Sequence, residues 1–136
     1  MPPISDHIHA LERFAASVGV TLRRLPMSEW QLGQVRGDHI RLRVGLSPEQ
    51  ELPTLVHELT HWLVHRDTFT DSGRTIREYE AEAVEAFVLI RLGLPELVAD
   101  AHGITAADSA EALLTQSKAR VVLAGSRLCA ALGLRD

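Results

Sequence analysis

Cysteine and long apolar runs are nearly absent from this chain. A single cysteine, Cys129, stands among its 136 residues. One thiol excludes an internal disulfide framework and a cysteine-based zinc site, and it is typical of proteins in a reducing compartment. No stretch of 18 apolar residues occurs, and residues 1–7 lack the basic segment and apolar run of a signal peptide. We therefore expect a cytoplasmic protein that does not span a membrane.

Positive charge is also scarce. The formal net charge is −4, which argues against attraction of the whole chain to nucleic acid, so a nucleic-acid partner would require a local basic patch. His39, Arg41 and Arg43 alternate with apolar residues and form either a solvated face or a contact surface for phosphate or DNA. With 46% hydrophobic and 24% charged residues, the composition predicts one globular domain over residues 1–136. The oligomeric state stays open.

Apolar spacing and turn residues predict an α+β fold. Apolar residues recur every three or four positions over residues 4–18, 75–92 and 104–132, which indicates helices. Short strands are expected at 21–25, 34–36 and 39–44, the last two flanking Gly37-Asp38 as in a hairpin. We expect a small antiparallel sheet packed on a central helix, with additional helices around it.

The helix that follows the sheet has a start signal and an internal proline. Ser47, Pro48 and Gln50 match an N-cap, a first helical residue and a capping glutamine. Pro53 then lies too far inside for an undisturbed helix. Either a short turn precedes the main helix, or the helix is kinked.

An H-E-x-x-H motif lies in this helix at residues 57–61. At about 100° per residue, His57 and His61 lie about 40° apart on one face, so both can bind one metal ion with Glu58 beside them. The opposite face is apolar and carries Leu55, Leu59, Trp62 and Leu63. The pattern predicts a catalytic zinc site of the zincin type, whereas the alternative is a helix with ordinary surface or hydrogen-bonded histidines.

A catalytic zinc ion takes three protein ligands and keeps one open position, so a third ligand is required. Asp67 has the spacing of one known zincin class, but that class needs glycine at position 64, where Val64 stands. The next helix offers Glu78 and Glu82, which share a face with a further glutamate, Glu85. We expect Glu78 as the ligand and Glu82 as an acceptor for a ligand histidine, although the two roles could be exchanged. Glu80 is expected to point away.

Two segments resemble a known family. Residues 57–65, HELTHWLVH, are similar to the H-E-L-x-H-x-L-x-H helix of the ImmA/IrrE family of zinc-dependent metallopeptidases and its antirestriction ArdC-like relatives. Residues 78–82, EYEAE, resemble the family's E-x-x-A-[D/N/E] segment. The resemblance covers roughly residues 40–95. It implies a zincin-like fold with a small sheet above an active-site helix, and zinc held by His57, His61 and Glu78.

The chemistry predicted for such a site is amide hydrolysis. Zinc would acidify a water and polarise the scissile carbonyl, while Glu58 takes the proton and later delivers it to the leaving nitrogen. His65 or Tyr79 could stabilise the oxyanion, although each could equally be a packing or surface residue. The strand at 39–44 could hold an extended peptide by strand addition.

Two functions of different classes follow. The first is a zinc-dependent peptidase that cleaves one regulatory protein. The second is an antirestriction or stress-response module that binds protein or DNA and retains the zincin scaffold without general protease activity. Glu58 distinguishes them, because a purely structural metal site needs no general base.

Overall fold

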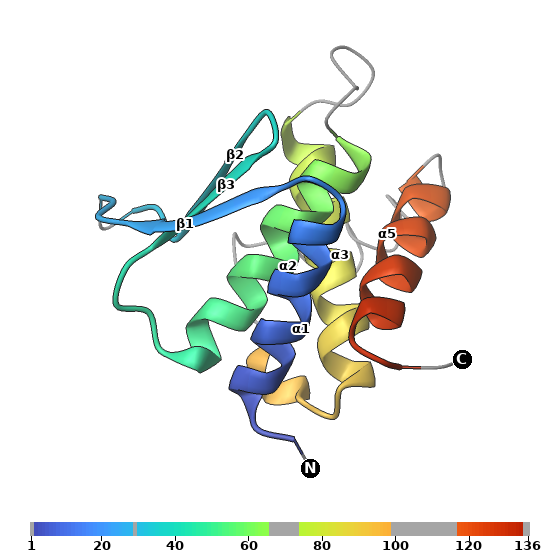
Figure 1. Cartoon of the computed structure of the whole chain (residues 1–136). Coiled ribbons are helices and arrows are strands. Elements are labelled where there is room, and N and C mark those ends of the chain that lie inside the picture. Colours follow the sequence, from blue (N-terminus) through green and yellow to red (C-terminus); the bar gives the residue numbers. More distant parts are fainter. Residues whose placement is uncertain (1, 29, 66–73, 99–116, 135–136) are drawn as a thin grey trace.

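The computed structural model describes residues 2–28, 30–65, 74–98 and 117–134. The described elements, in chain order, are α1 (Ile4–Ser17), β1 (Thr21–Leu25), β2 (Gly33–Arg36), β3 (His39–Arg43), α2 (Pro48–Val64), α3 (Arg74–Arg91), the 3-10 helix η1 (Pro95–Leu97) and α5 (Ser117–Ala131). The three strands form a sheet on one side of the helices (Figure 1). The α+β prediction is confirmed. Only the second half of the helix expected at 104–132 lies within the described residues.

The sheet is mixed and not antiparallel throughout. Its strand order is β1-β3-β2, with β1 parallel to β3 and β2 antiparallel to β3. The predicted hairpin between β2 and β3 is present, and Gly37 at its turn has a φ of +59°. Because the chain reverses direction twice between β1 and β3, the insertion of β3 beside β1 makes this pair parallel. β3 is therefore the central strand and is paired on both sides, so the expectation that an extended peptide adds to the strand at 39–44 is wrong.

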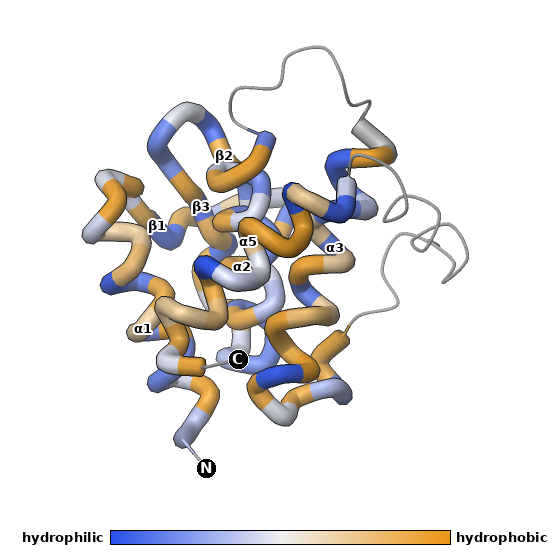
Figure 2. Tube along the Cα trace, turned by 90° about the vertical axis from the view of Figure 1, so that its right-hand side faces the viewer, coloured by the Kyte–Doolittle hydropathy of each residue, from blue (hydrophilic) through white to orange (hydrophobic). Residues whose placement is uncertain are grey.

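The core lies between the sheet and α2 and continues among the helices. From β3, Ile40 and Leu42 are fully buried, whereas Val44 follows the strand and is exposed. The helices contribute buried aliphatic side chains, including Leu11, Leu52, Leu55, Leu59, Val84, Val88 and Leu128. Hydrophobic and hydrophilic segments alternate along the helical tubes in Figure 2, as expected of amphipathic helices. α2 packs against α1, α3, α5 and the sheet, so it is the centre of the fold.

α2 is one continuous helix. Ser47 Oγ accepts a hydrogen bond from the Gln50 backbone at 3.3 Å, and Gln50 Oε1 accepts one from the Ser47 backbone at 3.2 Å, which confirms the capping box. Pro53 lies inside the helix, so no separate turn precedes it. The helical donor that proline lacks would have served the carbonyl of Glu49, an exposed residue that water can reach.

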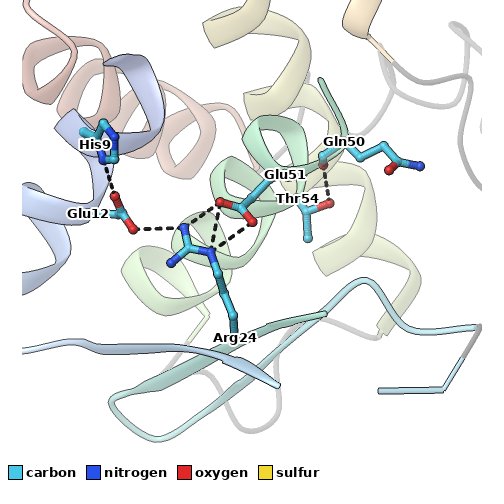
Figure 3. Close-up of polar contacts among 6 residues, drawn as sticks. All are labelled: His9, Glu12, Arg24, Gln50, Glu51 and Thr54. Carbon is cyan, nitrogen blue, oxygen red and sulfur yellow. Dashed lines mark hydrogen bonds and ion pairs between the residues drawn. The ribbon is translucent and has the colours of Figure 1, made fainter. Parts of the chain in front are cut away.

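Two polar contacts fix the sheet to α2. Arg24 on β1 binds Glu51 on α2 through Nε and Nη2, and it reaches Glu12 on α1 at 2.9 Å (Figure 3). Glu51 is only 8% exposed, and Arg24 supplies the cation beside its buried carboxylate. At the hairpin turn, Trp62 Nε1 donates to Asp38 Oδ1 at 2.9 Å. The two contacts hold opposite ends of α2 beneath the sheet.

Candidate metal centre

Three side chains from two helices converge at one point. His57 Nε2 lies 3.1 Å from His61 Nε2, as their spacing on α2 predicts. Glu78 on α3 brings Oε2 to 3.0 Å from His57 Nε2 and Oε1 to 3.1 Å from His61 Nε2. Within the part of the chain that the structure describes, these residues form the single group of three potential metal ligands, with ligand atoms within 4.8 Å of one another.

The geometry and the donor types of this group fit zinc. Zinc prefers histidine nitrogen and carboxylate oxygen at about 2.0–2.2 Å in a tetrahedral arrangement, which sets neighbouring ligand atoms roughly 3.3 Å apart. The observed separations of 3.0–3.1 Å are close to that value. Two nitrogens and one carboxylate also match the catalytic class of zinc sites, which leaves one position for water or substrate. His57, His61 and Glu78 therefore form a candidate His-His-Glu metal site.

The electrostatics of the pocket favour a positive charge. Burial opposes protonation of His57, but hydrogen bonds to Glu78 and Glu85 outweigh it and raise the pKa of His57 to about 10. Burial lowers the pKa of His61, and its hydrogen bond to Glu78 opposes this effect without outweighing it. Hydrogen bonds from both histidines lower the pKa of Glu78 well below its ordinary range. A metal ion would replace the proton on His57 as the cation that these carboxylates surround.

Each ligand histidine has a hydrogen-bond partner behind it. His57 Nδ1 lies 3.3 Å from Glu85 Oε1 on α3, and Glu85 is buried. His61 Nδ1 lies 2.7 Å from His65 Nδ1, one turn later at the C-cap of α2. His65 Nε2 in turn lies 2.6 Å from Glu80 Oε1. Such contacts fix the orientation of a ligand imidazole and the nitrogen that carries its proton.

The side chain of Glu58 projects from α2 toward the sheet. It is 8% exposed and touches β2 at Gly33, where a Cβ would lie 2.9 Å from Glu58 Cγ and 3.1 Å from Glu58 Oε2. Burial raises the pKa of Glu58 to about 7, with a smaller contribution from Glu78 and Glu85 and an opposing one from His57. A carboxylate with a pKa near neutrality can both accept and return a proton.

Comparison with known proteins identifies the family. A model of the IrrE N-terminal-like domain, a metallopeptidase family, matches residues 15–113. The chain belongs to this family. No curated protein and no solved structure matches the chain. The resemblance seen at residues 57–65 and 78–82 is thus confirmed.

Membership defines this protein as an ImmA/IrrE metallopeptidase with a zincin-like α+β domain. A peptidase domain implies a protein substrate, and the comparison does not specify which one. None of the helices in the described ranges is long and apolar enough to cross a membrane.

The structure places the other residues singled out in this metallopeptidase as follows. Glu82 is half-buried one turn after Glu78 and does not belong to the described group of three ligands. Asp67 lies outside the described residues. His65 has both ring nitrogens engaged by His61 and Glu80, so it is not placed to stabilise an oxyanion. Tyr79 is half-buried on α3, and its role as an oxyanion donor stays a prediction.

Sequence analysis placed Glu85 on the same helix face as Glu78 but assigned the histidine acceptor to Glu82, so the contact of Glu85 with His57 was not predicted. Glu85 follows Glu78 by seven residues, so it lies only about 20° from Glu78 around the helix. α2 and α3 run antiparallel, because His57 faces Glu85 while His65 faces Glu80. In such a pair, the earlier histidine meets the later glutamate, and this spacing could have identified Glu85.

Proposed function

We propose that this protein is a zinc-dependent peptidase that hydrolyses a peptide bond in a specific regulatory protein. His57, His61 and Glu78 hold the metal, and Glu58 is the general base. The convergence of these three ligand atoms beside a buried glutamate carries the proposal. A cytoplasmic location, a single domain over residues 1–136 and restriction to one substrate are parts of the same proposal.

A bound zinc ion supplies a Lewis acid, which acidifies water and polarises a scissile carbonyl. Glu58 then accepts the proton of the attacking water at its carboxylate and delivers it to the leaving nitrogen. The raised pKa of Glu58 suits both halves of this transfer. Gly33 supports the reaction indirectly, because the strand backbone presses on the Glu58 side chain and limits its positions.

Strand β2 is the best candidate for contact with an extended substrate. β3 is paired on both sides, whereas β2 has β3 on one side only within the described sheet. β2 also carries Gly33, the residue that touches Glu58. A peptide added to β2 would therefore lie next to the general base, with its main chain bound by hydrogen bonds.

The test compares wild type with Glu58→Gln, which keeps the shape of the side chain and removes its basicity. We expect both proteins to bind one equivalent of zinc, and only wild type to generate new protein N-termini in cells. Metal content by atomic emission and N-terminal proteomics measure the two properties. Identical sets of N-termini in the two strains would reject the peptidase assignment.

The outer face of the sheet favours a second candidate function, an antirestriction or stress-response module that binds DNA. Arg23 and Arg41 are paired in register across β1 and β3, and both are exposed. They line a groove of about 190 Å³ together with His39. Arginine pairs bind phosphate oxygens, and such binding weakens with salt. If Glu58→Gln retains the antirestriction or stress-response effect in cells while Arg23→Ala/Arg41→Ala loses it, the protein acts by binding DNA and not as a peptidase.

A further inference from the structure

A buried polar chain connects the candidate metal site to the last described helix. It begins at His61, passes through His65 at the C-cap of α2 to Glu80 on α3, and ends at Arg120 on α5. Arg120 Nε lies 2.8 Å from Glu80 Oε2 and 3.0 Å from Oε1, and Nη2 lies 2.8 Å from Oε2. Ser117 at the start of α5 also donates to Glu80. Figure 1 shows α5 beside α3, as this contact requires.

This chain is withdrawn from water. The side chain of Glu80 is fully buried, that of His65 is 4% exposed, and that of Arg120 is 24% exposed. A buried carboxylate without a cation would be costly, and the guanidinium of Arg120 supplies that cation beside the hydrogen bond from His65. A fully buried, charged glutamate that points away from the metal ligands requires a function or a structural reason.

The positions of the hydrogens follow from the donors and acceptors. Glu80 is an acceptor, so the hydrogen of its 2.6 Å contact belongs to His65 Nε2. With that hydrogen on Nε2, His65 can accept at Nδ1 the hydrogen of His61 Nδ1 across the 2.7 Å contact. When a metal takes the place of the hydrogen that His61 Nε2 shares with Glu78, His61 keeps its other hydrogen on Nδ1 and directs the Nε2 lone pair to the metal. This is the nitrogen that faces Glu78 and His57 in the metal site.

We propose that Glu80 and Arg120 position His61 as a metal ligand through His65, by fixing the His61 tautomer that directs the Nε2 lone pair into the site. All four are positioning or ligand groups, and only His61 would touch the metal. The proposal extends the usual carboxylate–histidine pairing by one imidazole, since a ligand histidine normally donates directly to its carboxylate or carbonyl partner.

The proposal gives α5 a role that family membership does not. The region of the chain that matches the family model ends at residue 113, and Ser117 and Arg120 lie beyond it. The metal site would thus depend on a helix outside the matched region. This inference rests on the proposed ligand set of His57, His61 and Glu78.

Zinc affinity of the purified full-length protein tests the proposal, measured by competition with a chromophoric chelator at fixed pH. Glu80→Gln keeps the shape of the side chain, but its amide can donate to His65 and reverse both tautomers. Arg120→Met removes the guanidinium and retains an aliphatic chain. Lys118→Met is the matched control, because it removes an exposed cation from the same helix. Visible spectra of the cobalt-substituted proteins report ligand geometry independently of activity.

We expect Glu80→Gln to weaken zinc binding roughly 10- to 100-fold and Arg120→Met to weaken it roughly tenfold. Both should shift the cobalt spectrum, Arg120→Lys should recover part of the affinity, and Lys118→Met should match wild type. Wild-type affinity and spectra in both Glu80→Gln and Arg120→Met would overturn the positioning role, even if these variants unfold at lower temperature. Absence of zinc binding in wild type would instead overturn the ligand set itself.

A measurement on wild type alone covers the case in which the variants do not fold. Long-range proton–nitrogen NMR of the zinc-loaded protein distinguishes the two nitrogens of each imidazole. We expect His61 to carry its proton on Nδ1 and His65 to carry its proton on Nε2. A proton on His61 Nε2 would contradict the proposal.

Discussion

Gly33→Ala should impair catalysis by displacing Glu58. The added Cβ would lie 2.9 Å from Glu58 Cγ, 2.9 Å from Thr54 Cγ2 and 3.1 Å from Glu58 Oε2. Carbon atoms pack at about 3.5–4.0 Å, so strand and helix must separate or Glu58 must move by roughly 0.6–1 Å. Overpacking of this kind costs about 1–3 kcal/mol of folding free energy. A shift of about 1 Å in a catalytic group costs on the order of 100-fold in rate.

The assay separates catalysis from folding and from metal binding. We would measure cleavage of the substrate recovered from the cellular comparison, zinc content, and the free energy of unfolding in urea. Gly125→Ala is a matched control, because its Cβ would lie 2.7 Å and 2.9 Å from two ring atoms of Phe87, away from Glu58. We expect both variants to lose stability and only Gly33→Ala to lose activity. In both, zinc content should stay at one equivalent.

A partial rescue sharpens the test. Thr54→Ser removes the Cγ2 atom that forms one of the close contacts with the new methyl group. In the double variant, α2 has more room for the methyl group, and part of the lost rate should return. Full activity in Gly33→Ala, or equal losses in Gly33→Ala and Gly125→Ala, would refute the view that the β2 backbone positions Glu58.

Other changes test the ligands and the contacts that support them. Glu78→Ala should abolish tight zinc binding, whereas Glu82→Ala should retain it; equal affinities in isothermal titration would show the ligand assignment to be wrong. Arg24→Met should destabilise the protein by about 2 kcal/mol in urea unfolding, because it leaves buried Glu51 without its cation. The loss is smaller than for a fully buried ion pair, because the Arg24 side chain is 35% exposed. Burial opposes ionisation of Glu12, but hydrogen bonds from His9 and Arg24 lower its pKa, so its stabilisation is present above its ordinary pKa of 4.5 and is lost as the pH falls below that value. Glu12→Gln should therefore lower stability at pH 7 and bring it closer to wild type under acid.

The parts of the site that sequence predicts are those fixed within one helix. The 40° separation of His57 and His61 follows from helical geometry alone, and the structure brings their Nε2 atoms to 3.1 Å. The capping box at Ser47 is equally local. Glu80 was expected to point away from the ligand face of α3; it does not belong to the group of three ligands, and it contacts His65 and Arg120.

The parts that sequence does not predict depend on how separate elements pack. The contact of His57 Nδ1 with Glu85 Oε1 at 3.3 Å depends on the rotation of α3 against α2. Antiparallel spacing favours a late glutamate for this contact, but only the rotation decides between Glu82 and Glu85. The partner of Glu80 is 40 residues away in sequence, and no spacing rule reports such a pair. Strand alternation predicts which side chains face the core, but it does not predict that β3 lies between β1 and β2.

The two functions of α2 depend on different neighbours. The sheet supports the general base, since Gly33 touches Glu58 and Arg24 fixes the first turns of the helix. α3 and α5 support the metal ligands, through Glu78 directly and through Glu80 by way of His65. Changes at the sheet contacts of Glu58 should therefore reduce turnover with zinc retained, whereas changes at Glu78, Glu80 or Arg120 should reduce zinc affinity first. If a variant at the sheet contacts lowered zinc affinity, or a variant at the metal-ligand contacts lowered turnover with zinc retained, the sheet and the other helices would be shown to act on α2 as one rigid unit.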